Sequence, residues 1–144
     1  PEAARRIRNE FPGARILVIS AVDSEEQVYR AAEAGVCGYL MKSAECSDVL
    51  DAIRQIHNGE TVFPESIARK IENRRKRPPF TKREMKILRW LVRGLSNKEI
   101  ATELNFSTST IKQEISRLLE KLGVSDRTRA ATLAIELGIV DLEE

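Results

Sequence analysis

The chain has 144 residues, of which 32% are charged and 42% hydrophobic, so it can form one domain of ordinary size or two small ones. No apolar stretch approaches the length of a membrane span, and no signal peptide opens the chain, so a cytoplasmic location without a membrane partner is expected. Cys37 and Cys46 match no metal-binding or redox spacing, so we expect free thiols, no metal site and no catalytic constellation.

The first 59 residues alternate helical and strand-like patterns. The expected elements are helices over 3–9, 24–34 and 47–57, and strands over 15–20 and 38–42. The strands are short apolar runs of the kind that a sheet buries on both faces. This order predicts an α/β unit with a parallel pair of strands. In the third helix, the residues expected to share the buried face are Val49, Leu50, Ile53 and Ile56.

Residues 60–79 have the composition of a linker. A helical piece over 65–73 is followed by the basic run 74–77 and then by Pro78-Pro79. We expect the basic run to be a flexible, solvated tether. The alternative is that it makes non-specific contacts with phosphates.

Four helical patterns follow over residues 80–144, which predicts an all-α domain. Thr81 and Glu84 form a capping box at the start of the first helix, and Ser96 and Glu99 form another at the second. The third helix is expected over about 108–122 and the fourth from about 126 to Gly138. A short polar turn joins the second and third helices. This is the outline of a helix-turn-helix, which places its second helix in the DNA major groove.

Positive charge is concentrated around these helices. Residues 69–129 contain 17 Lys and Arg against 7 Asp and Glu, whereas residues 1–63 contain 7 against 10. Such a concentration favours a polyanionic partner, because phosphate contacts release counterions. The alternative is an ordinary solvated basic face.

The third helix has two different faces. Its apolar stripe is expected to pack against neighbouring helices and comprises Ile111, Ile115, Leu118, Leu119 and Leu122. The opposite face contains Ser109, Gln113, Ser116 and Arg117, with Lys112 at its border. Lysine can read guanine, glutamine can read adenine and serine can contact either, so this face is typical of base reading. The candidate phosphate contacts are Lys98, Ser107, Thr108, Thr110, Arg117, Lys121 and Arg127.

The fourth helix has more apolar surface than three neighbouring helices can cover. One stripe comprises Ala130, Leu133, Ala134 and Leu137, and a second comprises Ala131 and Ile135. We expect a homodimer whose candidate interface residues are Ala130, Ala131, Ala134 and Ile135. A symmetric dimer presents two reading helices to half-sites about one DNA turn apart. The alternative is that the α/β unit covers the second stripe.

These motifs together resemble the LuxR/NarL/FixJ-type two-component response regulators over residues 80–140. The matching segments are Thr81-Lys82-Arg83-Glu84, Gly94-Leu95-Ser96-Asn97-Lys98-Glu99-Ile100-Ala101, Ser107-x-x-Thr110-Ile111-Lys112, Lys121-Leu122-Gly123-Val124 and Arg127-Thr128-x-Ala130. The resemblance implies that Lys112, Gln113 and Ser116 read bases and that the fourth helix forms the dimer interface on DNA. Glu114 departs from the family, which often has histidine there. A carboxylate near phosphates costs affinity unless it points aside or contacts cytosine.

The first unit resembles the second half of a CheY-like receiver. The resemblance implies that Ser20 bonds a phosphoryl group, that Tyr39 is the switch aromatic and that Lys42 neutralises phosphoryl charge. The acidic Mg²⁺ site and the phosphoacceptor aspartate of a receiver have no counterpart in these 144 residues, so we expect a fragment of a longer protein. The alternative is that the half-receiver pairs with a partner. No cofactor is expected for this chain, because only an intact receiver needs Mg²⁺ and a sensor histidine kinase.

The expected architecture is thus a partial CheY-like α/β receiver over 1–59, a linker over 60–79 and a four-helix helix-turn-helix domain over 80–144. We expect a sequence-specific regulator of transcription that binds double-stranded DNA, as the output component of a two-component phosphorelay, rather than an enzyme. The alternatives are the promoter-reading domain of a sigma factor, a phosphoryl-accepting switch without DNA output, and a dimeric protein-interaction adaptor. The spacing of Ser20 and Lys42 argues against the sigma factor.

Overall fold

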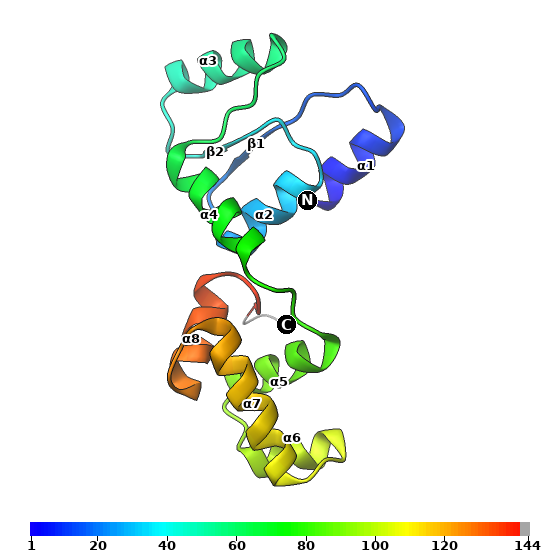
Figure 1. Cartoon of the computed structure of the whole chain (residues 1–144). Coiled ribbons are helices and arrows are strands. Elements are labelled where there is room, and N and C mark those ends of the chain that lie inside the picture. The colour runs from blue at the N-terminus through cyan, green and yellow to red at the C-terminus, as the bar shows by residue number, and fades with distance from the viewer. Residues whose placement is uncertain (142–144) are drawn as a thin grey trace. The chain divides into compact units, whose positions relative to one another are not determined.

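The computed structural model describes residues 1–141 and divides the chain into two compact units, Pro1–Lys76 and residues from Arg77 onward (Figure 1). Each unit has its own cluster of buried apolar side chains. We call them unit 1 and unit 2. Within the part of the chain that the structure describes, none of the helices is long and apolar enough to cross a bilayer.

Unit 1 contains a two-stranded parallel sheet with helices. Its elements are α1 (Glu2–Glu10), β1 (Leu17–Ser20), α2 (Glu25–Glu33), β2 (Gly38–Met41), α3 (Cys46–His57) and α4 (Glu65–Lys76). Leu17 pairs with Gly38 and Ser20 pairs with Met41, so the carboxyl ends of both strands meet at one edge of the sheet. The prediction of an α/β unit with two parallel strands is confirmed.

The buried side chains of unit 1 come mainly from α2, β2 and α4. They include Val28, Ala31, Tyr39, Ile67 and Ile71. By contrast, α3 buries Ala52 and Ile56, whereas about half of the surface of Leu50 and Ile53 is exposed. The prediction that Leu50 and Ile53 share the buried face was therefore wrong. The helix packs against β2, and its least exposed residues form a narrow stripe at i, i+3 and i+7 that begins at Val49.

Helix α4 lies inside the range expected to be a linker, yet it packs against α2. Ile67 and Ile71 are buried in the unit 1 core. Three cations of α4 meet carboxylates of α2 and of the loop before it: Lys70 lies 2.5 Å from Asp23 in that loop, Arg74 2.7 Å from Glu26, and Arg75 3.8 Å from Glu33. Arg74 also lies 4.6 Å from the centroid of the Tyr29 ring. The basic run is thus largely part of a helix–helix contact and not a flexible tether.

Unit 2 is entirely helical over its described residues. Its helices are α5 (Lys82–Val92), α6 (Asn97–Leu104), α7 (Thr108–Leu122) and α8 (Arg127–Glu136). The capping box of Thr81 and Glu84 is confirmed, since each side chain accepts a hydrogen bond from the other residue's N–H. Side chains of Ser96, Ser107 and Asp126 cap the other three helices. The left-handed conformation of Asn105, with φ of 57°, ends α6 and turns the chain into α7.

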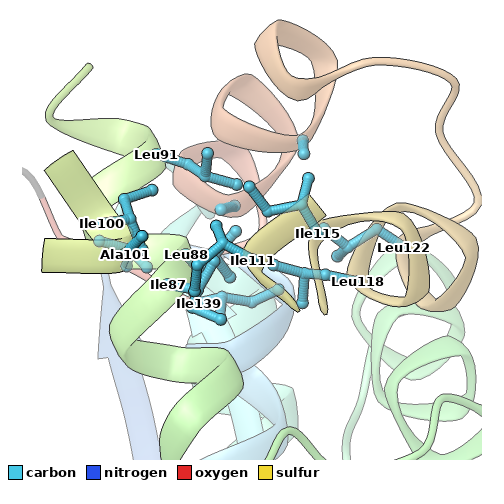
Figure 2. Packing of buried hydrophobic residues seen from close by; sticks show 13 residues of the cluster. Ile87, Leu88, Leu91, Ile100, Ala101, Ile111, Ile115, Leu118, Leu122 and Ile139 are labelled. Carbon is cyan, nitrogen blue, oxygen red and sulfur yellow. The ribbon is translucent and has the colours of Figure 1, made fainter. Parts of the chain in front are cut away.

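The core of unit 2 is formed where α5, α6, α7 and α8 meet, and Figure 2 shows its side chains. Ile87, Leu88, Ile100, Ile111 and Leu118 are completely buried. On α7 the predicted stripe is confirmed, because Ile111, Ile115, Leu118 and Leu122 face this core and Leu119 packs at its edge. Burying a leucine or isoleucine side chain contributes about 1.5–3 kcal/mol. This stripe therefore fixes which side of α7 faces outward.

Candidate nucleic-acid interface

Helix α7 presents a polar face on the side opposite its buried stripe. Five exposed residues make up this reading face: Ser109, Lys112, Gln113, Ser116 and Arg117. The helical period of the sequence predicted the same five residues. A helix can place such a face in the major groove, where amide, ammonium and hydroxyl groups meet the base edges.

The N-terminus of α7 adds groups suited to phosphate. Ser107 and Thr108 are exposed and Thr110 is half-buried. The Ser107 hydroxyl accepts a hydrogen bond from the Thr110 N–H at 3.2 Å and lies 2.8 Å from the Thr110 hydroxyl. Ser107 thus caps the helix, and the positive end of the helix dipole lies beside the reading face.

Glu114, the departure from the family pattern, is paired with an arginine of α5 and with an arginine of the reading face. Its carboxylate lies 3.6 Å from Arg83 and 3.9 Å from Arg117, and 18% of the side chain is exposed. The structure therefore places two positive charges beside the carboxylate, which reduces its repulsion of phosphates.

Lys121, a candidate phosphate contact, is held inside unit 2. Its ammonium donates to Glu84 at 2.7 Å and to the Pro79 carbonyl at 2.9 Å, and it lies 5.3 Å from the Phe80 ring centroid. Burial alone would raise the pKa of Glu84, but hydrogen bonds from Lys121 and Thr81 and the positive charge of Lys121 outweigh it and lower the pKa. Lys121 thus stabilises the contact between α5 and α7.

Arg127, another candidate phosphate contact, also has partners within unit 2. Its guanidinium donates to the Asn97 amide oxygen at 2.9 Å and to the Leu95 carbonyl. These bonds join the start of α8 to the turn before α6. Lys98, in the first turn of α6, is exposed. Of the four cations predicted to contact phosphate, Lys98 and Arg117 are exposed, whereas Lys121 and Arg127 are half-buried.

The candidate dimer interface needs a correction. Ala130 and Ala134 are completely buried in the core of unit 2, so a second chain cannot contact them. The small alanines of this stripe allow α8 to pack against α5. Ile135 is 37% exposed and Ala131 is half-buried, so only the second stripe faces outward.

The receiver-like residues of unit 1 gather at the carboxyl edge of its sheet. The backbone N–H of Lys42 donates to the Ser20 carbonyl at 2.9 Å, and the Ser20 hydroxyl accepts from the Val22 N–H at 3.1 Å. Tyr39 is buried, and its hydroxyl donates to the Val22 carbonyl. The backbones of Ser20 and Lys42 are therefore in contact at the carboxyl ends of the two strands.

The residues around this edge do not fit a Mg²⁺ site. Asp23, the nearest acidic residue along the chain after Ser20, forms an ion pair with Lys70. Among residues 1–141, no group of three or more His, Cys, Asp or Glu side chains is placed to hold a metal ion. Cys37 and Cys46 are free thiols.

Arg83 and Phe106 were not predicted as functional residues from the sequence. Arg83, in the first turn of α5, lies 4.6 Å from the centroid of the Phe106 ring, which belongs to the turn between α6 and α7. In the sequence, Arg83 is notable only because it lies within the capping-box segment Thr81–Glu84. The contact with Phe106 depends on tertiary packing and has no signal in the sequence.

Comparison with known proteins shows related sequences over both units. The family model "Bacterial regulatory proteins, luxR family" matches residues 78–134. The response regulator protein VraR of Staphylococcus aureus is 35% identical, in an alignment that covers 96% of this chain and 69% of VraR. VraR of Staphylococcus epidermidis is 34% identical with the same coverage.

Solved structures share the fold of this chain. The RcsB response regulator of Salmonella typhimurium superimposes with a TM-score of 0.69 at 24% identity, over 89% of this chain and 63% of RcsB. An RcsB–DNA complex matches with a TM-score of 0.60 at 25% identity, over 92% of this chain and 65% of that one. The chain thus spans slightly less than two thirds of the RcsB chains.

The similarity to VraR extends through the α/β unit, which argues against a sigma-factor fragment. The match of the family model falls on the helix-turn-helix of unit 2. The chain therefore belongs to the LuxR family of bacterial response regulators.

Proposed function

We propose that this chain is the DNA-binding output part of a two-component transcription regulator and is not an enzyme. The observation that supports this most strongly is the exposed reading face of α7, held from behind by the buried stripe of Ile111, Ile115 and Leu118. The related RcsB is described in a complex with DNA. The net positive charge of the residues around α7 favours a phosphate-rich partner.

Within the reading face, we assign base contacts to three residues. Lys112 suits the guanine O6 and N7 acceptors, Gln113 suits adenine, and Ser116 suits either. Phosphate contacts are assigned to exposed groups around them: Lys98, Ser107, Thr108, Thr110 and Arg117. Lys121 and Arg127 leave this set, because their charged groups are bound to partners within unit 2.

We further propose that two copies bind DNA through the outward stripe of α8, with Ala131 and Ile135 at the contact. These residues replace the larger set expected from the sequence, since Ala130 and Ala134 are buried. A two-fold dimer would place two copies of α7 in half-sites about one helical turn apart. In the complete regulator, an intact receiver would use Mg²⁺ and a sensor histidine kinase as its partner.

The overall proposal is tested by selecting duplexes from a random-sequence pool with the full 144-residue chain at low salt. Repeated enrichment of one sequence pattern, bound more tightly than a scrambled duplex of the same composition, is the expected result. Failure to retain any duplex would overturn the proposal and favour the adaptor alternative.

Replacing Lys112 with alanine tests the base-reading assignment. We expect the affinity for the selected duplex to fall by about 1–3 kcal/mol and the preference at one base pair to relax. Lys98→Ala serves as the matched control, because loss of a phosphate contact weakens all duplexes alike and lowers the salt slope by about one. Fluorescence anisotropy on single-base variants of the duplex measures both. Equal, sequence-independent losses for the two variants would refute the role of Lys112.

A further inference from the structure

We infer that Arg83 is a positioning residue that sets the orientation of α7 for DNA and neutralises Glu114. The inference rests on the proposed function of α7 and adds a residue outside the helix-turn-helix to it. Arg83 belongs to α5 and lies outside the reading face.

Arg83 contacts both segments whose geometry matters for reading DNA. Its guanidinium lies 4.6 Å from the centroid of the Phe106 ring, in the turn that joins α6 to α7. A terminal nitrogen of the same group lies 3.6 Å from the Glu114 carboxylate on α7. A planar guanidinium can stack on an aromatic ring and pair with a carboxylate at once, whereas a lysine ammonium is a point charge.

A second contact next to Arg83 makes the orientation specific. Glu84, the following residue, forms an ion pair with Lys121 at 2.7 Å. Glu114 and Lys121 are seven residues apart and therefore lie two turns apart on the same flank of α7. Arg83 and Glu84 are neighbours on α5 and carry opposite charges. Arg83 pairs with Glu114 of α7, and Glu84 pairs with Lys121 of α7. A rotation or a slide of α7 would separate both pairs.

Glu114 gives this contact a role in DNA binding. The carboxylate belongs to the helix that approaches the phosphates, where an uncompensated negative charge would repel them. Arg83 at 3.6 Å and Arg117 at 3.9 Å bracket it. Because half of the Arg83 side chain is exposed, its ion pair adds little to folding. The main effect of losing Arg83 should therefore appear in DNA binding and not in stability.

A double-mutant cycle in the full chain tests this role. The variants are Arg83→Ala, Glu114→Gln and the double variant, measured against the duplex selected by the wild-type chain and against its scrambled counterpart. We expect Arg83→Ala to lower the affinity for the selected duplex about tenfold and to reduce discrimination. In the Glu114→Gln background the same change should cost about threefold or less, because no carboxylate is left uncompensated. Circular dichroism at the assay temperature verifies that every variant is folded.

Two further variants test whether the charge or the flat shape of the Arg83 side chain is needed, and whether the effect is specific to this arginine. Arg83→Lys keeps the charge near Glu114 but loses the flat contact with Phe106, so its affinity should lie between those of wild type and Arg83→Ala. Arg54→Ala is the matched control: it removes an exposed arginine from unit 1, also paired with a carboxylate at 3.6 Å. Its affinity for the selected duplex should stay within about twofold of wild type.

The outcomes are separable. Equal losses from Arg83→Ala in both backgrounds, with a salt slope reduced by about one, would make Arg83 a direct phosphate contact and overturn the inference. Unchanged affinity in Arg83→Ala would overturn it as well, while leaving the proposed function intact. A wild-type chain that retains no duplex would overturn the proposed function and the inference together.

Discussion

Replacing Leu118 with alanine is expected to lower the free energy of unfolding of unit 2 by about 2–5 kcal/mol. Leu118 is completely buried at the middle of the α7 stripe, so the change removes apolar contacts and leaves a cavity. A domain of this size has only about 3–10 kcal/mol of stability in total. The substitution should therefore populate unfolded unit 2 and weaken binding to every duplex, although Leu118 does not belong to the reading face.

Urea unfolding followed by tryptophan fluorescence measures this effect in unit 2 selectively. Trp90 is the only tryptophan of the chain, and it packs against the unit 2 core. The transition midpoint should fall without a change in the slope m. Glu120→Ala, an exposed change two residues along the same helix, should stay within about 0.5 kcal/mol of wild type. A wild-type midpoint for Leu118→Ala would show that the stripe does not hold α7.

The parts of the fold that the sequence predicts well are those set by local periodicity and capping. The stripe from Ile111 to Leu122 repeats with the helical period, so both faces of α7 follow from the sequence alone. Thr81 and Glu84 are three residues apart, and their reciprocal hydrogen bonds need no distant partner. The two strands are parallel because a helix connects them, which also brings Ser20 and Lys42 to one edge.

The parts that the sequence does not predict depend on contacts between residues far apart in the chain. From the sequence, Arg74 is expected to be one cation of a solvated basic run. In the structure it forms an ion pair with Glu26, 48 residues away, and both side chains are largely buried. From the sequence, Lys121 is expected to be a phosphate-binding cation beside the reading face. In the structure its ammonium binds Glu84, which lies 37 residues away on α5. A basic residue has the same appearance in a sequence whether its charge faces a phosphate or a carboxylate.

For α8, the sequence does not predict which of two apolar faces is buried. Two apolar stripes are visible in its sequence, but the period alone does not say which one the domain uses. The structure assigns Ala130 and Ala134 to the core and leaves Ile135 at the surface. Alanine is compatible with either place, because it is small enough for a tight helix contact within a domain or between two copies. Only the position of α5 distinguishes the two.

Replacing Lys121 with alanine is the change for which we expect the second large effect. It leaves the Glu84 carboxylate without its cation in a site where 15% of the glutamate side chain is exposed. Loss of one partner from a fully buried pair costs about 3–5 kcal/mol, and partial exposure reduces this to about 2–3 kcal/mol here. Lys86→Ala, which removes an exposed lysine from α5, should change the free energy of unfolding by less than about 0.5 kcal/mol.

The pH dependence of this loss identifies its cause. The folded-state pKa of Glu84 lies below its ordinary value of 4.5, so the ionised carboxylate stabilises the wild-type fold above pH 4.5, and this contribution is lost as the pH falls through the folded-state pKa. Without Lys121, burial favours the protonated carboxyl group, so the variant gains relative stability on acidification. Urea titrations from pH 7 to pH 3, followed by Trp90 fluorescence, should show the gap between wild type and Lys121→Ala narrowing below pH 4.5. A gap that stays constant over this range would mean that Lys121 acts through packing on Phe80 and not through the charge of Glu84.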